Sequence, residues 1–434
     1  MAAHGNSNLN PRIRLSAGDP RFVLMLTALV VLAVLPFIAV GAGDTFMVSF
    51  VSKVMIFAIA AASLDLILGY GGMVSFGHAA YIGLGAYAVA VSTKYFGDLC
   101  ADVDEGQACA YGYLASGYFQ FAVAIVGSAL VALVIGAISL RTTGLYFIMI
   151  TLAFTQMLFF LGVSLEPFGG DDGMTIDYRS DFLFFNLADN LINDPDDELD
   201  GATLYYFSLG ALLVTLLLLR RIVNSRFGMV IRGSFSNPVR MAALGFPVYR
   251  YRLTAFVIAG AICGVAGSLF ANHQEFLTPE YMMWIRSGEI MIMVIMGGMG
   301  TIFGPVFGAF VFYGLEEFLP ALVDKDYWMI VFGPMLVILV LFAKRGLFGL
   351  VPDAWAGMPK FLLGLMAVLA ASAIFLFLIT FASPLVIVLI LIAIAFVLKL
   401  AVDYGGMKSP LVTVREALDA VAQNPVFGGR RSNG

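Results

Sequence analysis

Three ionisable residues lie within long apolar stretches of this sequence, and each is a candidate for chemistry. Asp65 stands in SLDLILG and His78 in GHAAYIG, on either side of a glycine-rich stretch, and Glu289 in SGEIMIMVIMGG opens a second such stretch. Ionisable groups inside a membrane are costly, so they commonly mark a substrate or ion pathway. The alternatives are that they support an irregular backbone or lie near the membrane surface.

The two glycine-rich stretches resemble each other. GGMVSFG at 71–77 and GGMGTIFG at 297–304 begin with GGM, end with FG and differ in length by one inserted residue. Interrupted hydrophobic segments at matching positions of two halves indicate the substrate site of a transporter with internal repeats. Helix N-termini after such breaks would offer free N–H groups to a carboxylate or carbonyl group. The alternative is that the glycines only let helices approach closely.

A further apolar stretch, residues 141–160, carries several hydroxyl groups. Thr151 and Thr155 are four residues apart, so they share a helix face, and Gln156 follows them. This stripe either lines a pathway or hydrogen-bonds to its own or a neighbouring backbone. The candidate substrate-pathway residues are therefore Asp65, Gly71, Gly72, His78, Tyr81, Thr151, Gln156, Glu289, Gly297 and Gly298.

Signatures of enzymes and metal sites are missing from the sequence. It has no GxxxxGK[ST], HExxH or GxSxG motif, and its three histidines, His4, His78 and His273, are widely separated. We expect no catalytic residue, no metal and no cofactor in this chain. If transport is driven by ATP, the ATPase is a separate subunit.

The elements that position these residues are membrane helices. The chain is 61% hydrophobic and 12% charged, and apolar runs long enough to cross a bilayer recur along it. We predict an all-α polytopic membrane protein of about nine to twelve passes, two of them broken or re-entrant, with the N-terminus inside. The apolar runs are 22–41, 46–69, 78–93, 118–140, 143–165, 203–219, 253–272, 288–315, 327–343, 361–381 and 384–402.

The distribution of basic residues orients the helices. Loop 220–252 has seven arginines and no acidic residue, so it is cytoplasmic, whereas loops 94–117 and 166–202 are poor in Lys and Arg and lie outside. The segments 46–93 and 287–314 must then enter the membrane and return, turning at their glycines. The expected divisions are a cytoplasmic tail at 1–21, a transmembrane domain at 22–350, an extra helical hairpin at 351–403 and a second cytoplasmic tail at 404–434.

The first apolar run and the three cysteines each give a further prediction. The run at 22–41 is longer than the apolar core of a signal peptide, so we expect an uncleaved first helix. Cys100 and Cys109 share one outer loop, where a disulfide is one of two alternatives, whereas Cys263 lies in an apolar run and is expected to pack there.

The arginine-rich loop contains SNPVRMAALG, which predicts a short helix. Ser236 or Asn237 would cap its start, Pro238 would stand near the first helical position, and Gly245 would end it. Such a helix either belongs to a solvated, lipid-headgroup-binding loop or docks into a soluble motor.

The sequence resembles the permease subunits of branched-chain (hydrophobic) amino-acid ABC importers, the leucine/isoleucine/valine type. The resemblance spans about residues 45–350 and is carried by SLDLILGYGGMVSFGHAAYIGLGAYAVA, LRTTGLYFIMITLAFTQ, FGMVIRGSFSNPVRMAALGFPVYRYR and SGEIMIMVIMGGMGTIFGPVFGA through FAKRGLFGL. It implies two ATP-binding subunits, which hold ATP and magnesium, a sister permease and an extracytoplasmic solute-binding protein. It also implies a coupling helix, for which the candidate residues are Arg232, Asn237, Arg240, Ala243 and Gly245.

The chain departs from the family pattern at two places. Ala242 stands where the family usually has an acidic residue, and residues 352–434 extend beyond the usual end. The resemblance implies an inner-membrane permease for hydrophobic amino acids, with urea and short amides as related substrates, surrounded by lipids and without a nucleic-acid partner. The alternative is a stand-alone secondary transporter or channel, which would also use broken helices.

Overall fold

The computed structural model describes residues 28–29, 32–33, 35–36, 45–97, 116–176, 179–182, 185–186, 202–322, 332–337 and 346–347. The chain divides into two units, residues 1–356 and 357–434, and all described residues belong to the first. Cys100, Cys109, both predicted tails and the predicted hairpin at 351–403 lie outside the described residues.

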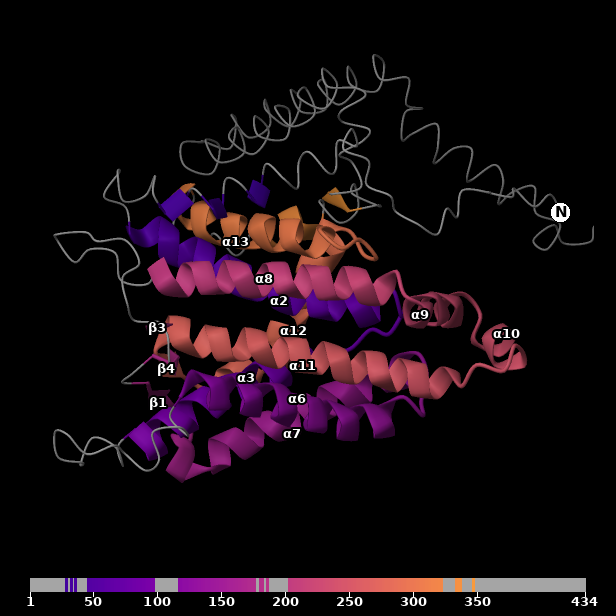
Figure 1. The fold of residues 1–434 in the computed structure, drawn as a ribbon, viewed down its shortest axis with the longest axis horizontal. Helices are drawn as coiled ribbons and strands as arrows, with labels where there is room; N and C mark the ends of the chain where they lie inside the picture. Colours follow the sequence, from indigo (N-terminus) through magenta and orange to yellow (C-terminus); the bar gives the residue numbers. More distant parts are fainter. Residues whose placement is uncertain are drawn as a thin grey trace, which may run out of the picture. The chain divides into compact units, whose positions relative to one another are not determined.

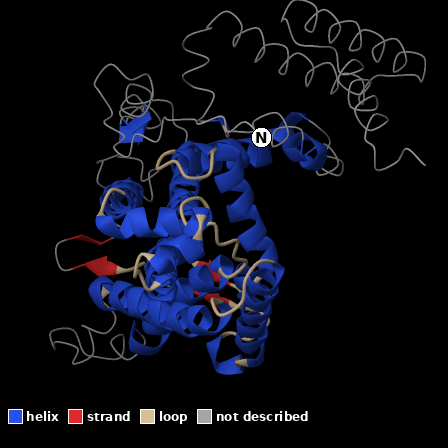
Figure 2. Cartoon of the chain, turned by 90° about the vertical axis from the view of Figure 1, so that its right-hand side faces the viewer, coloured by secondary structure: helices blue, strands red, loops and turns tan. Residues whose placement is uncertain are grey.

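The described part is almost entirely helical, with strands only as two-residue pieces (Figures 1 and 2). Five helices are long and apolar enough to cross a membrane, and this confirms the polytopic all-α class. They coincide with the apolar runs of the sequence. The long crossing helices are α2 (Thr45–Leu68), α6 (Gly117–Ser139), α7 (Leu145–Ser164), α8 (Ala202–Val223) and α11 (Val248–Gln274).

Three other membrane helices flank the predicted breaks. Helix α3 (His78–Ser92), continued by the π-helical turn η1 (Thr93–Gly97), follows the first break, and α12 (Trp284–Gly297) and α13 (Gly304–Leu322) flank the second. Both breaks are therefore confirmed. Helix α2, whose 24 residues span about 36 Å, is long enough for a complete crossing. Helices α3 and α12, with 15 and 14 residues, are the short ones.

Small residues allow α11 to pack closely at the centre of this unit. Helix α11 contacts α2, α3 and α6. A Cβ on Gly264 would overlap the Ser128 hydroxyl, and one on Gly267 would overlap the Ile82 carbonyl. Small residues at helix interfaces let backbones approach within the bilayer. Cys263 is buried and free at this interface, as expected.

One end of the bundle carries short strands that the sequence did not predict. Strand β1 (Met174–Thr175) pairs antiparallel with β4 (Phe276–Leu277), and β2 (Asp181–Phe182) pairs with β3 (Phe185–Asn186). Two 3₁₀ turns, η2 (Glu166–Phe168) and η3 (Pro279–Met282), complete this end. The β1–β4 pairing connects the outer loop 166–202 to the residues that follow α11.

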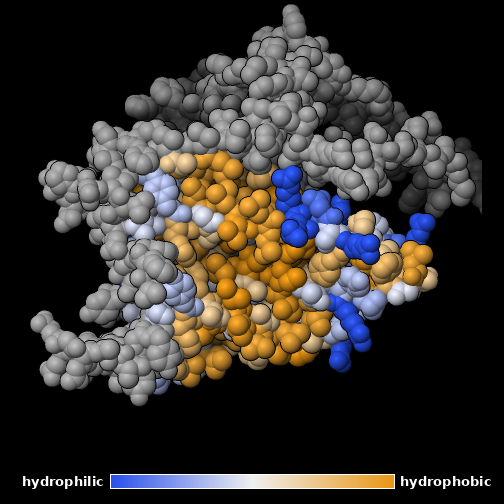
Figure 3. All heavy atoms as spheres, in the orientation of Figure 1, coloured by the Kyte–Doolittle hydropathy of each residue, from blue (hydrophilic) through white to orange (hydrophobic). Residues whose placement is uncertain are grey.

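The opposite end carries two helices of the arginine-rich loop, α9 (Arg226–Ser236) and α10 (Pro238–Ala243) (Figure 1). Figure 3 shows an apolar surface band over the membrane helices and, beside it where α9 and α10 lie, a surface that mixes hydrophilic and apolar residues. The arginines mark this end as cytoplasmic, so the strand end is the outer one.

Candidate functional site

The first break, residues 69–77, is held by hydroxyl groups from other helices. The Phe76 N–H donates to Thr151 Oγ1 at 3.2 Å, and the Phe76 carbonyl accepts from Thr155 Oγ1 at 2.9 Å and Ser287 Oγ at 2.7 Å. Irregular backbone at membrane depth requires such partners. Both threonines are completely buried, so the threonine stripe hydrogen-bonds to backbone, which was one of its two predicted roles.

The N-termini of the two short helices meet at this break. The Ala79 N–H donates to Ser287 Oγ at 2.9 Å, which joins the first turn of α3 to the first turn of α12. The His78 carbonyl accepts from the Cys263 thiol, and Cys263 lies about 22 Å along α11. The two N-termini therefore lie near the middle of the membrane. The glycine pattern predicts that the N-terminus of α13, the helix after the second break, lies at this place. The N-terminus of α12 lies here instead.

The second break, residues 298–303, touches the first. The Asp65 carboxylate accepts a hydrogen bond from the Gly300 N–H at 2.8 Å and is only 2% exposed. A Cβ on Gly69 would overlap that same N–H group. Asp65 therefore supports the junction between the two breaks, 235 residues apart in sequence.

The glycines of the two breaks serve different purposes. Gly72 and Gly298 adopt φ angles of 66° and 119°, a region in which side chains are strained. Gly71 and Gly297 instead allow close approach, because a Cβ on Gly297 would overlap the Gly304 carbonyl and one on Gly71 would lie 2.7 Å from the Ile67 carbonyl. The close-packing alternative therefore describes Gly71 and Gly297.

Buried polar groups without partners surround the first break. The rings of His78 and Tyr81 are completely buried, with centroids 5.7 Å apart. Among the described residues, neither ring nitrogen of His78 nor the Tyr81 hydroxyl has a hydrogen-bond partner, and the same holds for Gln156 Nε2. Leaving such groups unpaired is costly, so these atoms are able to accept or donate a new hydrogen bond here.

Glu289 lies away from the glycines of the second break, and its predicted place on the substrate pathway stays a prediction. Its carboxylate pairs with the Arg286 guanidinium at 2.8 Å, within the first two turns of α12. Nine residues separate it from Gly298, or about 13 Å of helix.

Glu289 instead belongs to a group of charged residues from three helices. The Lys53 ammonium lies 4.9 Å from the centre of the Tyr313 ring. Glu316 interacts electrostatically with Lys53, Glu289 and Arg286. Of these four residues, only Glu289 is predicted from the sequence as a candidate. A lysine within an apolar run and an Arg–Glu pair at i,i+3 were the signals that could have revealed the others.

A cleft of about 280 Å³ opens beside the first break at the cytoplasmic end. The turn between α6 and α7 forms its other wall, and Arg252 contributes from α11. It is lined by Gly72, Met73, Val74, Leu140, Thr142, Thr143, Gly144, Leu145, Phe147, Ile148 and Arg252.

The predicted short helix in the arginine-rich loop is confirmed as α10. Asn237, and not Ser236, caps it by accepting a hydrogen bond from the Arg240 N–H at 2.9 Å, with Pro238 at the first position. Gly245 follows with φ of 87°. No residue of α10 is buried. Coupling candidates Asn237, Arg240, Ala243 and Gly245 are exposed, as are the apolar residues Val239 (77%) and Leu244 (66%).

Helix α9, which the sequence analysis did not separate from its loop, links α10 to the first break. The ring of Phe235, at the end of α9, covers Gly72 so closely that a Cβ there would overlap it. Arg252 donates to the Ser234 carbonyl at 2.7 Å, and Arg232 donates to the Val223 carbonyl at 2.9 Å. The coupling candidate Arg232 thus binds the carboxyl end of α8, unlike the exposed Arg240.

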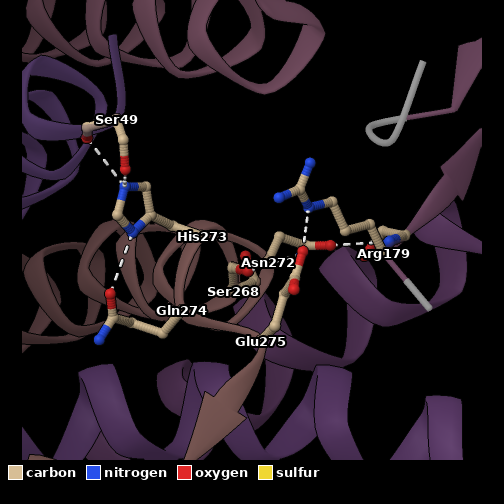
Figure 4. Close-up of polar contacts among 8 residues, drawn as sticks. Ser49, Arg179, Ser268, Asn272, His273, Gln274 and Glu275 are labelled. Atoms are coloured by element: carbon tan, nitrogen blue, oxygen red, sulfur yellow. Dashed lines mark hydrogen bonds and ion pairs between the residues drawn. The ribbon is translucent and has the colours of Figure 1, made fainter. Parts of the chain in front are cut away.

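The outer end is tied together by polar contacts at the end of α11 (Figure 4). Arg179 forms an ion pair with Glu275 at 2.6 Å, and the Ser180 N–H donates to Asn272 Oδ1 at 2.7 Å. The ring of His273 bonds to the Ser49 carbonyl and to Gln274. In the described part of the chain, His, Cys, Asp and Glu form no cluster suited to a metal ion.

A family model described as the permease component of the branched-chain amino acid transport system matches residues 46–340. The chain belongs to this family. Two permease proteins LivM of high-affinity branched-chain amino acid transport systems are similar to it: that of Escherichia coli K12 is 26% identical over 343 residues, and that of Salmonella typhimurium LT2 is 25% identical over 339 residues. Each match covers 75% of this chain and 74% of the relative.

A shorter match covers 25% of this chain and 33% of the probable permease LivH of Methanocaldococcus jannaschii, with 33% identity over 108 residues. No solved structure matches the chain. The chain is thus the permease component of an ABC importer and a multi-pass protein of the bacterial inner membrane. This permease is therefore a transport component.

Proposed function

We propose that this permease forms one half of the pore of an ATP-driven importer of branched-chain or other hydrophobic amino acids. The family and the two LivM relatives support the substrate class. The two touching breaks and the cleft beside them support a pathway through this part of the chain. Urea or a short amide is the competing cargo within the same transport class.

The observation that carries the ATP-driven mechanism is the contact of α9 with Gly72. Helix α10 exposes Val239 and Leu244 at the cytoplasmic end, and α9 joins it directly to the first break. Docking of α10 into an ATP-binding subunit would therefore move the backbone of the break. In this proposal two such subunits hold ATP and magnesium, and this chain holds neither.

The other partners follow from the orientation of the chain. A solute-binding protein would deliver the substrate at the outer end, near the Arg179–Glu275 ion pair. A sister permease would complete the pore. Exposed apolar residues of α6 and α7, such as Val126 and Met149, would contact either this subunit or lipid.

The test begins with the tagged chain purified in a mild detergent from its own membranes, and with mass spectrometry of the proteins that accompany it. The complex is then placed in liposomes with its binding protein, and uptake of radiolabelled L-leucine is measured with ATP and with a non-hydrolysable analogue. We expect two ATPases, a sister permease and uptake only with ATP. A chain that purifies alone and carries leucine without ATP would instead be a stand-alone secondary transporter.

A substitution in α10 tests the coupling contact. Val239→Glu should lose the ATPase subunits, because it puts a charge in the centre of an apolar docking surface. Thr175→Glu, at an exposed position of the outer end, is the matched control and should retain them. Equal recovery of ATPase with both variants would refute the role of α10.

A further inference from the structure

Four charged side chains, Lys53 of α2, Arg286 and Glu289 of α12 and Glu316 of α13, gather in one place. We call them the charge cluster. Arg286 and Glu289 are 2.8 Å apart, and Glu316 interacts electrostatically with the other three. Two cations and two carboxylates make the cluster neutral as a whole.

The charge cluster lies at membrane depth. Lys53 is about 12 Å from the outer end of α2, and the first turns of α12 lie near the middle of the membrane. Charged groups at such depth face the interior of a protein or a water-filled cavity. Arg286 and Glu289 keep 35% and 22% of their side-chain surface exposed, so a ligand can reach this pair from the surface of the described part.

Helix packing does not account for the Arg286–Glu289 pair. The two residues belong to the same helix at i,i+3, so their ion pair joins no two elements. Such a pair on a helix contributes little stability. Beside the pair, the hydroxyl of Tyr313 is buried and has no hydrogen-bond partner among the described residues. Tyr313 interacts electrostatically with both members of the pair, so its hydroxyl is a hydrogen-bond donor close to Arg286 and Glu289.

We propose that the charge cluster binds the ammonium and carboxylate groups of an amino acid in transit. Arg286 takes the carboxylate, and Glu289 and Glu316 take the ammonium group. The inference rests on the proposed function, because it requires a zwitterionic substrate.

The chemistry of the charge cluster matches a zwitterion. A guanidinium binds a carboxylate through two parallel hydrogen bonds, and the N-terminus of α12 adds positive potential at the same place. Without substrate, Arg286 and Glu289 neutralise each other, so no unpaired charge is left within the membrane. A neutral zwitterion can exchange partners with this pair without adding net charge. Trp284 and Ile285, exposed by 43% and 48%, offer apolar surface for the side chain of the substrate.

The test uses the complete complex in liposomes, with L-leucine as the probe, and measures uptake and binding-protein-stimulated ATP hydrolysis together. Arg286→Gln should lower uptake about 100-fold, because it leaves the carboxylate unpaired. Arg286→Lys keeps the charge but loses the two-pronged geometry, and should lower uptake about tenfold. ATP hydrolysis should persist in both, since α10 is untouched. Glu166→Gln, at an exposed carboxylate of the outer end, is the matched control with unchanged uptake.

The double variant Arg286→Glu/Glu289→Arg separates binding from structure. It restores an ion pair at the same two positions but reverses the polarity seen by the substrate, so we expect uptake to stay as low as in Arg286→Gln. Uptake within about twofold of wild type in this variant would overturn the proposal, because a structural pair tolerates the exchange. Parallel loss of uptake and ATP hydrolysis in Arg286→Lys would also overturn the proposal. If Arg286→Gln does not assemble into the complex, Arg286→Lys is the variant that decides.

The same assay separates this proposal from the one on which it rests. A wild-type complex that hydrolyses ATP but carries no leucine, isoleucine or valine would overturn the amino-acid substrate. A wild-type complex that carries leucine, with variants that do so equally well, would overturn the charge cluster alone.

Discussion

The carbonyl group of Phe76 illustrates how single side chains make a broken helix tolerable in a membrane. It accepts two hydroxyl hydrogen bonds, from Thr155 and from Ser287, which lie on different helices. Either donor alone satisfies the carbonyl, and loss of both leaves it buried and unpaired. An unsatisfied buried acceptor costs about 1–3 kcal/mol, more than the loss of one of two bonds.

A double-mutant cycle tests this arrangement. Thr155→Val should lower the free energy of unfolding by about 1 kcal/mol. Ser287→Ala should lower it by about 2 kcal/mol, because it also removes the acceptor of the Ala79 N–H, and the double variant should lower it by more than the sum. The measurement is the thermal unfolding midpoint of the purified protein in detergent. Thr254→Val, which removes an exposed hydroxyl bond within α11, is the control and should have little effect. Strictly additive losses would show that the two hydroxyls do not share the carbonyl.

A second prediction for a single residue concerns Asp65. It separates the role of the negative charge from the role of the side-chain oxygen as a hydrogen-bond acceptor. Among the described residues, the carboxylate has a single polar contact, the Gly300 N–H at 2.8 Å. Asp65→Asn keeps an acceptor and should retain leucine uptake within about threefold, whereas Asp65→Leu should abolish it by separating the breaks. If both variants lose uptake equally, the charge itself is required, as in an ion pathway.

At the scale of elements, α9 connects α10 to the first break. Two side chains in the second half of α9 fix it: Arg232 binds the Val223 carbonyl at the end of α8, and Phe235 lies against Gly72. In the proposed mechanism, a movement of α10 would therefore reach Gly72.

The contact between Gly72 and Phe235 gives a prediction for this element. Gly72→Ala should strongly reduce uptake, because the new Cβ overlaps the ring and φ is 66°. Adding Phe235→Ala should restore part of the uptake by removing the overlap. The matched control is Gly210→Ala in α8, where a Cβ would meet open space, so uptake should be unchanged. Failure of Phe235→Ala to help would mean that backbone strain alone explains the defect.

Two arginines of the same region should behave differently. Arg240→Glu should leave the unfolding midpoint unchanged but lower ATP-driven uptake, since Arg240 lies on exposed α10. Arg232→Glu should lower the midpoint, because the side chain no longer binds the Val223 carbonyl. The measurements are thermal unfolding and uptake in liposomes. The reverse pattern would place Arg232, and not Arg240, in the docking surface.

For the whole molecule, the arginine-rich helices and the short strands define opposite faces of the membrane. In a variant whose only accessible cysteine is Val239→Cys, a membrane-impermeant maleimide should react only after the cells are opened. Phe276→Cys, 40% exposed beside β1, should react in intact cells. Labelling of both positions from the same side would overturn the orientation derived from the basic residues.

Local sequence patterns predicted the helices and breaks but not the contacts between them. Apolar run length predicted α2 and α11, and the Asn-Pro and Gly signals predicted α10, because these depend on neighbouring residues alone. The bond from Asp65 to Gly300 and the gathering of Lys53 with Glu316 depend on how distant helices pack. Such contacts leave no periodic signal, so the sequence associates Glu289 with the nearest break and shows Lys53 only as a lysine within an apolar run.

The hydrogen bond between Asp65 and Gly300 also has a consequence for biosynthesis. Ribosomes add about 5–20 residues per second, so the 235 residues between donor and acceptor take roughly 12–47 seconds to make. During that interval α2 has already emerged, with a carboxylate near its inner end and no Gly300 to meet it. The nascent chain must keep Asp65 in contact with water, at the membrane surface or in the insertion machinery, until the second half of the protein arrives.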